Sequence, residues 1–135
     1  MKVIIDTNLW ISFLIGHQTQ FVRRILTDLR FDVYVCRQLI EEIRDVASRD
    51  KISRHVNAVE VEDLLAIIQA FCQFTTIDAE IAPSAVRDPK DLYLLALADT
   101  IGADYIVSGD ADLTDLSQHN QTKIIKLADF KAMIL

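Results

Sequence analysis

Acidic side chains recur along the chain at places where a strand ends or a helix begins. Asp6 and Asp110 each follow a short apolar run typical of a buried strand, and Glu42 and Asp91 lie early in helical patterns. Carboxylates gathered without His or Cys select a hard cation that prefers oxygen ligands, Mg²⁺ or Mn²⁺. Such a site suits phosphodiester hydrolysis, because the cation activates a water molecule and stabilises charge on the leaving oxygen.

Asp91 has the most unusual position of the four acids. Residues 88–91 predict a helix start with Asp88 as N-cap, and on that helix Asp91 lies in line with Leu94, on the face that should enter the core. A carboxylate aimed inward needs a partner, because an unpaired buried charge is costly. Asp91 can instead favour the helix dipole, and Asp110 can instead be an ordinary turn residue. The argument for a site therefore needs several acids to meet.

Strand and helix patterns alternate along the whole chain, which predicts an α/β fold. A central parallel sheet between two helix layers, the three-layer α/β/α arrangement, follows from this alternation. Strands are expected over 2–5, 32–36, 103–108 and 123–127, with a brief edge strand over 74–77. Helices are expected over 9–14, 20–29, 39–47, 58–74, 89–101 and 128–135, with a loop or short helix over 48–57 and a connecting loop over 81–86.

The predicted topology brings the four acids together. Right-handed crossovers place the carboxyl ends of the strands at one edge of the sheet, where open α/β folds bind ligands. Asp6 and Asp110 meet at this edge, and helices that follow strands begin there, as those of Glu42 and Asp91 do. Each acid alone also fits a local role; Asp6, for example, fits an Asx turn before a helix.

The helical pattern of residues 39–47 separates two adjacent acids. Its apolar positions place Glu42 at the border of the buried face and Glu41 almost opposite that face. Glu42 is therefore expected to reach a site at the rim of the core, whereas Glu41 is not. A solvated Glu42 is the ordinary alternative.

Composition limits the class of protein. A chain of 135 residues with 51% hydrophobic residues predicts one folded domain, residues 1–135. Apolar runs fall short of the ~18 residues of a transmembrane helix, and Asp6 interrupts the N-terminal run too soon for a signal peptide, so no membrane association is expected. Cys36 and Cys72, far apart and outside any CxxC pair, are typical of reduced thiols in a cytoplasmic protein.

The net charge of −6 excludes nucleic-acid binding by phosphate neutralisation alone, because such proteins are basic. A cation held by the carboxylates would supply the missing attraction. Seven arginines in the first half form either a basic patch or solvated helix faces. They are Arg23, Arg24, Arg30, Arg37, Arg44, Arg49 and Arg54.

Four short motifs together resemble the PIN-domain family of metal-dependent ribonucleases. They are IIDTN at 4–8, LIEEIRDV at 39–46, DPKDLYLLALA at 88–98 and YIVSGDADL at 105–113. The resemblance covers essentially the whole chain and is greatest to small single-domain members, many of them VapC-like toxins of toxin–antitoxin pairs. It implies a three-layer α/β/α fold, Mg²⁺ or Mn²⁺ as cofactor, and RNA as substrate.

The resemblance also assigns roles to residues. The acids of the family fall on Asp6, Glu42, Asp91 and Asp110, and an additional acid used by some members falls on Asp112. Asp6, Asp91 and Asp110 are the implied metal ligands, and Glu42 is a ligand or a base that orients water. Ser108 stands where the family usually has Thr before the Gly-Asp turn.

Besides RNA, the implied partners are an antitoxin protein and a second copy of the chain in a homodimer. Apolar helix faces after Trp10 and around Leu64 suit either partner, or belong to the core. Other functions remain open: a housekeeping RNA-processing nuclease, or a PIN-like module that only binds protein. An aspartyl-nucleophile phosphatase fits poorly, because it would need Asp where the chain has Asn8.

Overall fold

The structure, a computed structural model, describes residues 1–78 and 91–134. In this part of the chain six strands form one sheet in the order β3-β2-β1-β4-β6-β5. They are β1 (Lys2–Ile5), β2 (Asp32–Val35), β3 (Gln73–Phe74), β4 (Tyr105–Val107), β5 (Gln118–His119) and β6 (Thr122–Ile125). All pairings are parallel except that of β5 with β6, so the predicted parallel sheet is confirmed with an antiparallel strand added at one edge.

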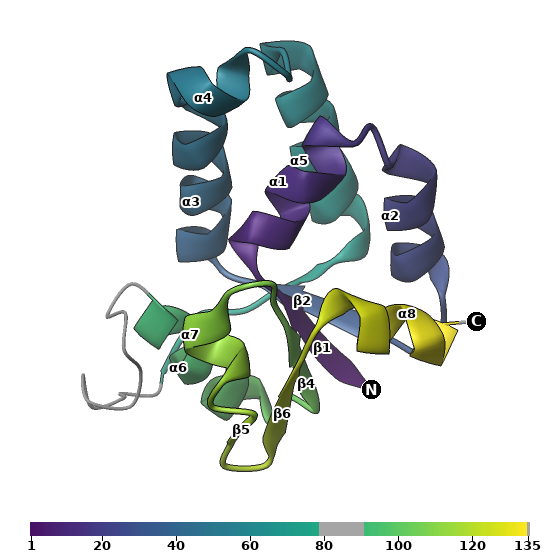
Figure 1. The fold of residues 1–135 in the computed structure, drawn as a ribbon. Helices are drawn as coiled ribbons and strands as arrows, with labels where there is room; N and C mark the ends of the chain where they lie inside the picture. The colour runs from purple at the N-terminus through teal and green to yellow at the C-terminus, as the bar shows by residue number, and fades with distance from the viewer. Residues whose placement is uncertain (79–90, 135) are drawn as a thin grey trace.

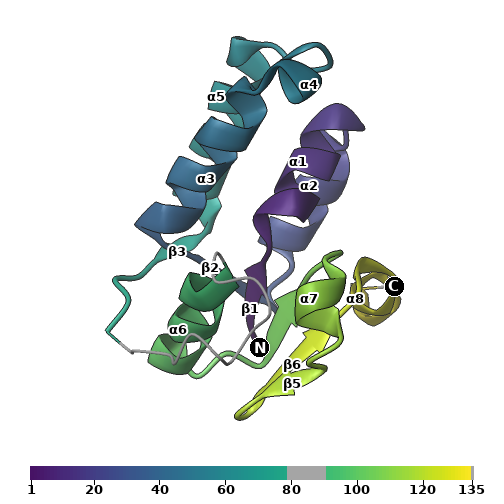
Figure 2. The same cartoon turned by 60° about the vertical axis from the view of Figure 1, so that its left-hand side comes forward.

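Helices cover both faces of this sheet, as the three-layer prediction requires. They are α1 (Thr7–Ile15), α2 (Thr19–Thr27), α3 (Arg37–Ser48), α4 (Asp50–Ser53), α5 (Ala58–Phe71), α6 (Leu92–Ile101), α7 (Ala111–Thr114) and α8 (Leu127–Ile134). Helices α1, α2, α3 and α5 stand above the sheet in Figure 1, and α6 lies below it. Turning the molecule shows α3 beside α5 and α1 beside α2 (Figure 2).

The central strand β1 fixes the position of the predicted site. It pairs with β2 on one side and β4 on the other, and its Val3, Ile4 and Ile5 side chains are buried, as a β-branched apolar run between two helix layers should be. Behind it the indole of Trp10 is fully buried and donates its N–H to the Ile5 carbonyl at 3.0 Å. The end of β1, where Asp6 follows, is therefore held in place by the two neighbouring strands and by Trp10.

Several predicted boundaries needed correction. The helix predicted over 58–74 ends at Phe71, because Gln73 and Phe74 pair with β2; the edge strand thus lies earlier than the predicted 74–77. Within residues 48–57 the chain forms α4, and α7 and β5 were not predicted. The predicted Asp88 cap and the loop over 81–86 lie outside the described residues.

The apolar faces suggested for partners are largely core. Trp10 is fully buried, and Leu64 is 6% exposed. In the two described stretches of the chain, no helix is both long and apolar enough to cross a bilayer.

A basic patch made of the seven arginines is not what the structure shows. Four of them pair with neighbouring carboxylates, namely Arg30 with Asp28, Arg37 with Glu41, Arg44 with Glu62 and Arg49 with Asp45. Arg30 and Asp28 lie in the turn before β2, and the other three pairs lie on or next to helices, which favours the alternative of solvated helix faces.

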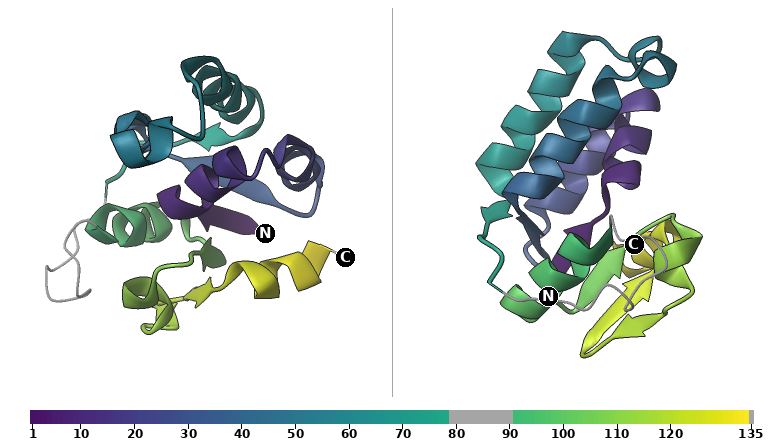
Figure 3. Two further views of the ribbon diagram at one scale, coloured as in Figure 1. Left: turned by 45° about the horizontal axis from the view of Figure 1, so that its top comes forward. Right: turned by 90° about the vertical axis from the view of Figure 1, so that its left-hand side faces the viewer.

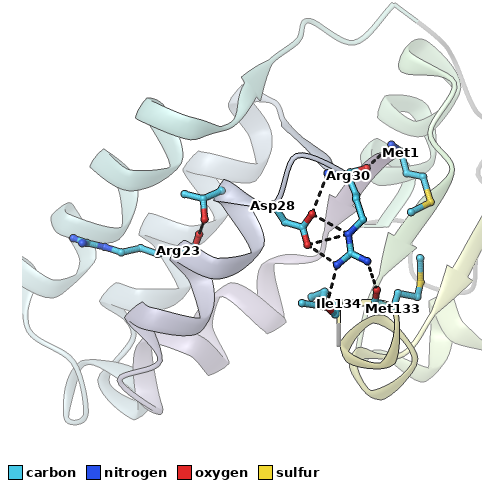
Figure 4. Close-up of polar contacts among 7 residues, drawn as sticks. Met1, Arg23, Asp28, Arg30, Met133 and Ile134 are labelled. Atoms are coloured by element: carbon cyan, nitrogen blue, oxygen red, sulfur yellow. Dashed lines mark hydrogen bonds and ion pairs between the residues drawn. The ribbon is translucent and has the colours of Figure 1, made fainter.

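Arg30 has a further, structural role at the far side of the fold. Its guanidinium donates to both carboxylate oxygens of Asp28 and to the carbonyls of Met133 and Ile134, at the end of α8 (Figure 4). The N-terminal ammonium of Met1 donates to the Arg30 carbonyl at 2.7 Å. Arg30 thus ties α8 and the N-terminus to the turn before β2; the three segments also lie together in Figure 3.

Candidate active site

A cleft of about 640 Å³ opens at the carboxyl edge of the parallel strands. Its walls come from the segments after β1 and β4, from the length of α3 and from the starts of α1 and α6. All four predicted acids line it, namely Asp6, Glu42, Asp91 and Asp110. The structure therefore brings together four carboxylates that the sequence places in four separate segments.

Asp6 is the most firmly held of these carboxylates. Its backbone N–H donates to the Val107 carbonyl at 2.9 Å, which continues the β1–β4 ladder by one residue. The side chain is 3% exposed. Although Asp6 occupies the N-cap position of α1, its carboxylate accepts a hydrogen bond from the Ser108 hydroxyl at 2.7 Å. Asp6 is thus turned toward the neighbouring strand, and a purely local role in capping does not account for its position.

Ser108 links Asp6 to the turn that carries Asp110. The Ser108 side chain is fully buried, and its Oγ accepts the backbone N–H of Asp110 at 3.0 Å. One oxygen of Asp110 in turn accepts the N–H of Asp112 at 2.9 Å and caps α7. Asp110 is therefore both a turn residue and a residue of the cleft. The described lining does not include Asp112, whose role as a ligand stays a prediction.

The structure confirms the predicted difference in burial between Glu42 and Glu41, but not the prediction that Glu41 does not reach the site. Glu42 is half-buried, whereas the Glu41 side chain is 61% exposed and pairs with Arg37 at 2.8 Å. Glu41 nevertheless also lines the cleft, as do Asp45 and Arg49, which form an ion pair.

Tyr93 is a residue of the cleft that the sequence analysis missed. Its hydroxyl lies 3.3 Å from Oγ1 of Thr7, and the nearby charge of Glu42 contributes to raising its pKa. Tyr93 therefore links the start of α6 to the start of α1 and lies close to Glu42 on α3. The helical pattern gave no signal for it, because a residue two positions after an inward-facing Asp91 lies nearly opposite on the helix.

Burial and crowding of negative charge shape the electrostatics of the cleft. Burial raises the pKa of Asp6, the Ser108 hydrogen bond opposes this, and the nearby charges of Glu42 and Asp110 raise the pKa further. Burial is also the main cause that raises the pKa of Tyr93, to which the charges of Glu42 and Asp6 add. Tyr93 is therefore a neutral hydrogen-bond donor near neutral pH, and the cleft has a potential that attracts cations.

The donors of the cleft suit a hard cation. The described lining offers carboxylates, amide oxygens and a phenol, with neither His nor Cys. Over the described residues no three acidic, His or Cys side chains already surround a single point as ligands. Mg²⁺ usually keeps several water molecules and takes only one or two carboxylates, so a donor set of this openness fits a hydrated ion.

The fold and the cleft together define a class, that of α/β proteins whose parallel sheet presents carboxylates at its carboxyl edge. The sequence model described as "PIN domain" matches residues 2–112, and the chain belongs to the PIN-domain family. PIN domains are generally nucleases, so membership supports a hydrolase that acts on nucleic acid.

Solved structures with low sequence identity share this fold. VapBC2 from Rickettsia felis, bound to a DNA fragment from its promoter, aligns with a TM-score of 0.59 at 10% identity, over 93% of this chain and 98% of that chain. The PIN domain of human SMG5 gives 0.54 at 14% identity, over 98% of both chains. The PIN domain of T. brucei RRP44 gives 0.50 at 16% identity, over 97% of this chain and 79% of that chain. Comparison with curated proteins finds no match.

Proposed function

We propose that the chain is an endoribonuclease that hydrolyses RNA phosphodiester bonds with Mg²⁺ or Mn²⁺ held by Asp6, Glu42, Asp91 and Asp110. The observation that carries the proposal is the meeting of these four acids in one cleft of a PIN-domain protein. The acids also explain how an acidic chain could approach RNA, because a bound cation reverses the local repulsion of phosphate.

The residues of the cleft have distinct parts in this proposal. Asp6 and Asp91 are buried and would be ligands with fixed positions, and Asp110 would be a third. Glu42 is half-buried, which gives it access to water as a ligand or as the group that orients the attacking water. When bound, the cation would lower the pKa of that water and stabilise charge on the leaving oxygen.

Two hydroxyls would hold the site in place. Ser108 donates to Asp6, and the Tyr93 hydroxyl lies 3.3 Å from that of Thr7, the residue next to Asp6. Outer hydrogen bonds of this kind orient metal-binding carboxylates, and their loss typically costs about 10–100-fold in metal affinity or activity.

Cleavage of a mixed RNA substrate with Mn²⁺, Mg²⁺ or EDTA tests the proposal. Wild type should cleave only with metal, and Asp6→Asn and Asp91→Asn should each lower the rate by more than about 100-fold, beyond the loss expected for an outer residue. Asp63→Asn, an exposed acid on α5, is the matched control and should cleave as wild type does. Cleavage in EDTA, or full activity of Asp91→Asn, would contradict the proposal.

We propose further that the chain is the toxin of a toxin–antitoxin pair, a role suggested by the VapBC2 structure. A groove of about 440 Å³ between α1, α2 and α5 would seat a protein partner, and its exposed lining is polar, with Arg23 and Asp63 among its residues. Expression of wild type should arrest growth, and Asp6→Asn should not; a housekeeping nuclease would leave growth unchanged. Homodimer formation stays a prediction, which sedimentation measures directly.

A further inference from the structure

A second hollow, of about 380 Å³, adjoins the acidic cleft. It lies between the end of the edge strand β3 and the start of α3, and is lined by Phe74, residues 75–77, Arg37 and Gln38. Gln38 also lines the acidic cleft, so the two hollows share a wall. A chain molecule that crosses the carboxylates can therefore continue into the second hollow.

Phe74 gives this hollow an aromatic surface with a fixed position. Phe74 is 53% exposed as a residue, although it stands at the end of a strand. Its backbone is held in the sheet, because Phe74 is in register with Val35 and the next N–H, that of Thr75, donates to the Val35 carbonyl at 3.0 Å. Phe71 is similarly exposed, at 49%, but lies on α5 and lines neither hollow.

Arg37 adds a positive charge beside the ring. Its side chain is 89% exposed, and its Nε donates to Glu41 at 2.8 Å. Because a guanidinium carries five N–H donors, this pairing leaves nitrogens that suit a phosphate. Glu41 lines the acidic cleft, so the pair lies at the boundary between the two hollows.

We propose that the second hollow binds one unpaired nucleotide of the RNA strand, next to the bond that the acidic cleft would cleave. Phe74 stacks on the base, Arg37 contacts an adjoining phosphate, and Gln38 with the hydroxyls of Thr75 and Thr76 forms the polar rim. Aromatic rings combined with Arg are the chemistry by which proteins hold single strands. This subsite deepens the proposed ribonuclease function and rests on it.

The net charge of the chain favours such a subsite. A cation in the acidic cleft attracts phosphate only locally, and the chain as a whole has a net charge of −6. Binding energy for RNA must therefore come partly from contacts that do not depend on net charge, and base stacking is of this kind. A protein segment would prefer a more apolar surface than one bordered by Arg, Gln and two Thr residues.

Fluorescence of Phe74→Trp tests the stacking directly. Trp10 is the only natural tryptophan and is fully buried, so changes on titration report the new indole. An unpaired RNA of about 12 nucleotides, within the usual range of single-strand sites, should quench it. An abasic ribose-phosphate oligomer of the same length is the control ligand, and it should leave the fluorescence of the new tryptophan unchanged.

Cleavage kinetics provide the second test. Phe74→Ala should raise KM by about 5- to 150-fold, the range for loss of one base–aromatic stack, with little change in kcat. Phe71→Ala is the matched control and should retain the KM of wild type. In a plot of the logarithm of the RNA-binding constant against the logarithm of salt concentration, Arg37→Gln should lower the magnitude of the slope by about one. Arg44→Gln should leave this slope unchanged.

The outcomes separate this subsite from the proposed function. If wild type cleaves RNA but the bases cause no quenching and Phe74→Ala keeps its KM, the subsite is wrong and the ribonuclease stands. If RNA quenches the Trp fluorescence but wild type cleaves no RNA, the base-binding hollow stands and the ribonuclease proposal is wrong. If wild type neither cleaves nor binds RNA, both proposals fail.

Discussion

Ser108→Ala should destabilise the fold and weaken the site together. The Ser108 hydroxyl is fully buried and makes two hydrogen bonds, donating to the Asp6 carboxylate at 2.7 Å and accepting the Asp110 N–H at 3.0 Å. Alanine fills nearly the same space, so the substitution removes the hydrogen bonds with little change in packing.

The expected loss follows from the nature of the two bonds. A hydrogen bond to a charged group contributes about 1.5–3 kcal/mol, and a bond between neutral groups about 1 kcal/mol. Asp6 is 3% exposed, so water cannot replace the lost donor at the carboxylate without a rearrangement. We therefore expect the free energy of unfolding to fall by about 2–4 kcal/mol, which lowers Tm by roughly 6–16 °C for a chain of this size.

Urea and thermal unfolding measure this loss, with Ser48→Ala as control. The Ser48 hydroxyl is exposed and donates to the Asp45 carbonyl at 2.7 Å, so its removal should change stability by less than about 0.5 kcal/mol. RNA cleavage by Ser108→Ala should fall about 10–100-fold, as for other groups that orient metal ligands. A Ser108→Ala protein as stable as Ser48→Ala would refute the bridging role of the hydroxyl.

Three further predictions concern other parts of the structure. Tyr93→Phe should keep the fold, because the ring remains, but should lower RNA cleavage by about 10–100-fold through loss of the hydroxyl, as steady-state kinetics would show. A hydrogen bond from Arg30 lowers the pKa of Asp28 to about 2. This stabilisation is present above the unfolded pKa of about 3.9 and is lost as pH falls through about 2, so the Tm difference between wild type and Arg30→Gln should shrink over that range. Gly102→Ala should lower the free energy of unfolding in urea by about 1–2 kcal/mol, because Gly102 has a φ of 66°, which favours glycine. The added methyl group would meet no atom within 4 Å, so the loss comes from the backbone conformation alone. An unchanged stability would contradict this reasoning.

The position of the site could be predicted because it depends on regular patterns. The apolar run at residues 2–5 matches β1 at both ends, so Asp6 was placed correctly at the end of the central strand. Helical periodicity alone separated half-buried Glu42 from exposed Glu41. Strand direction and crossover handedness then sufficed to bring Asp91 and Asp110 to the same edge.

What could not be predicted depends on contacts between distant segments. The hydrogen bonds of Ser108 with Asp6 and of Tyr93 with Thr7 join residues that no local pattern relates. The strand β5 and the helix α7 have two and four residues, too few for a periodicity to be visible. The turn between β5 and β6 carries Asn120 at a φ of 51°, which Asn tolerates, but one such residue does not specify a hairpin.

Calorimetric titration with Mn²⁺ tests the metal site without relying on activity. Wild type and Asp63→Asn should bind the ion equally, and Asp6→Asn should bind it at least about 10-fold more weakly, because Asp6 is buried and lies close to the charges of Glu42 and Asp110. Equal binding by all three proteins, or no binding by wild type, would show that the four acids do not form a metal site.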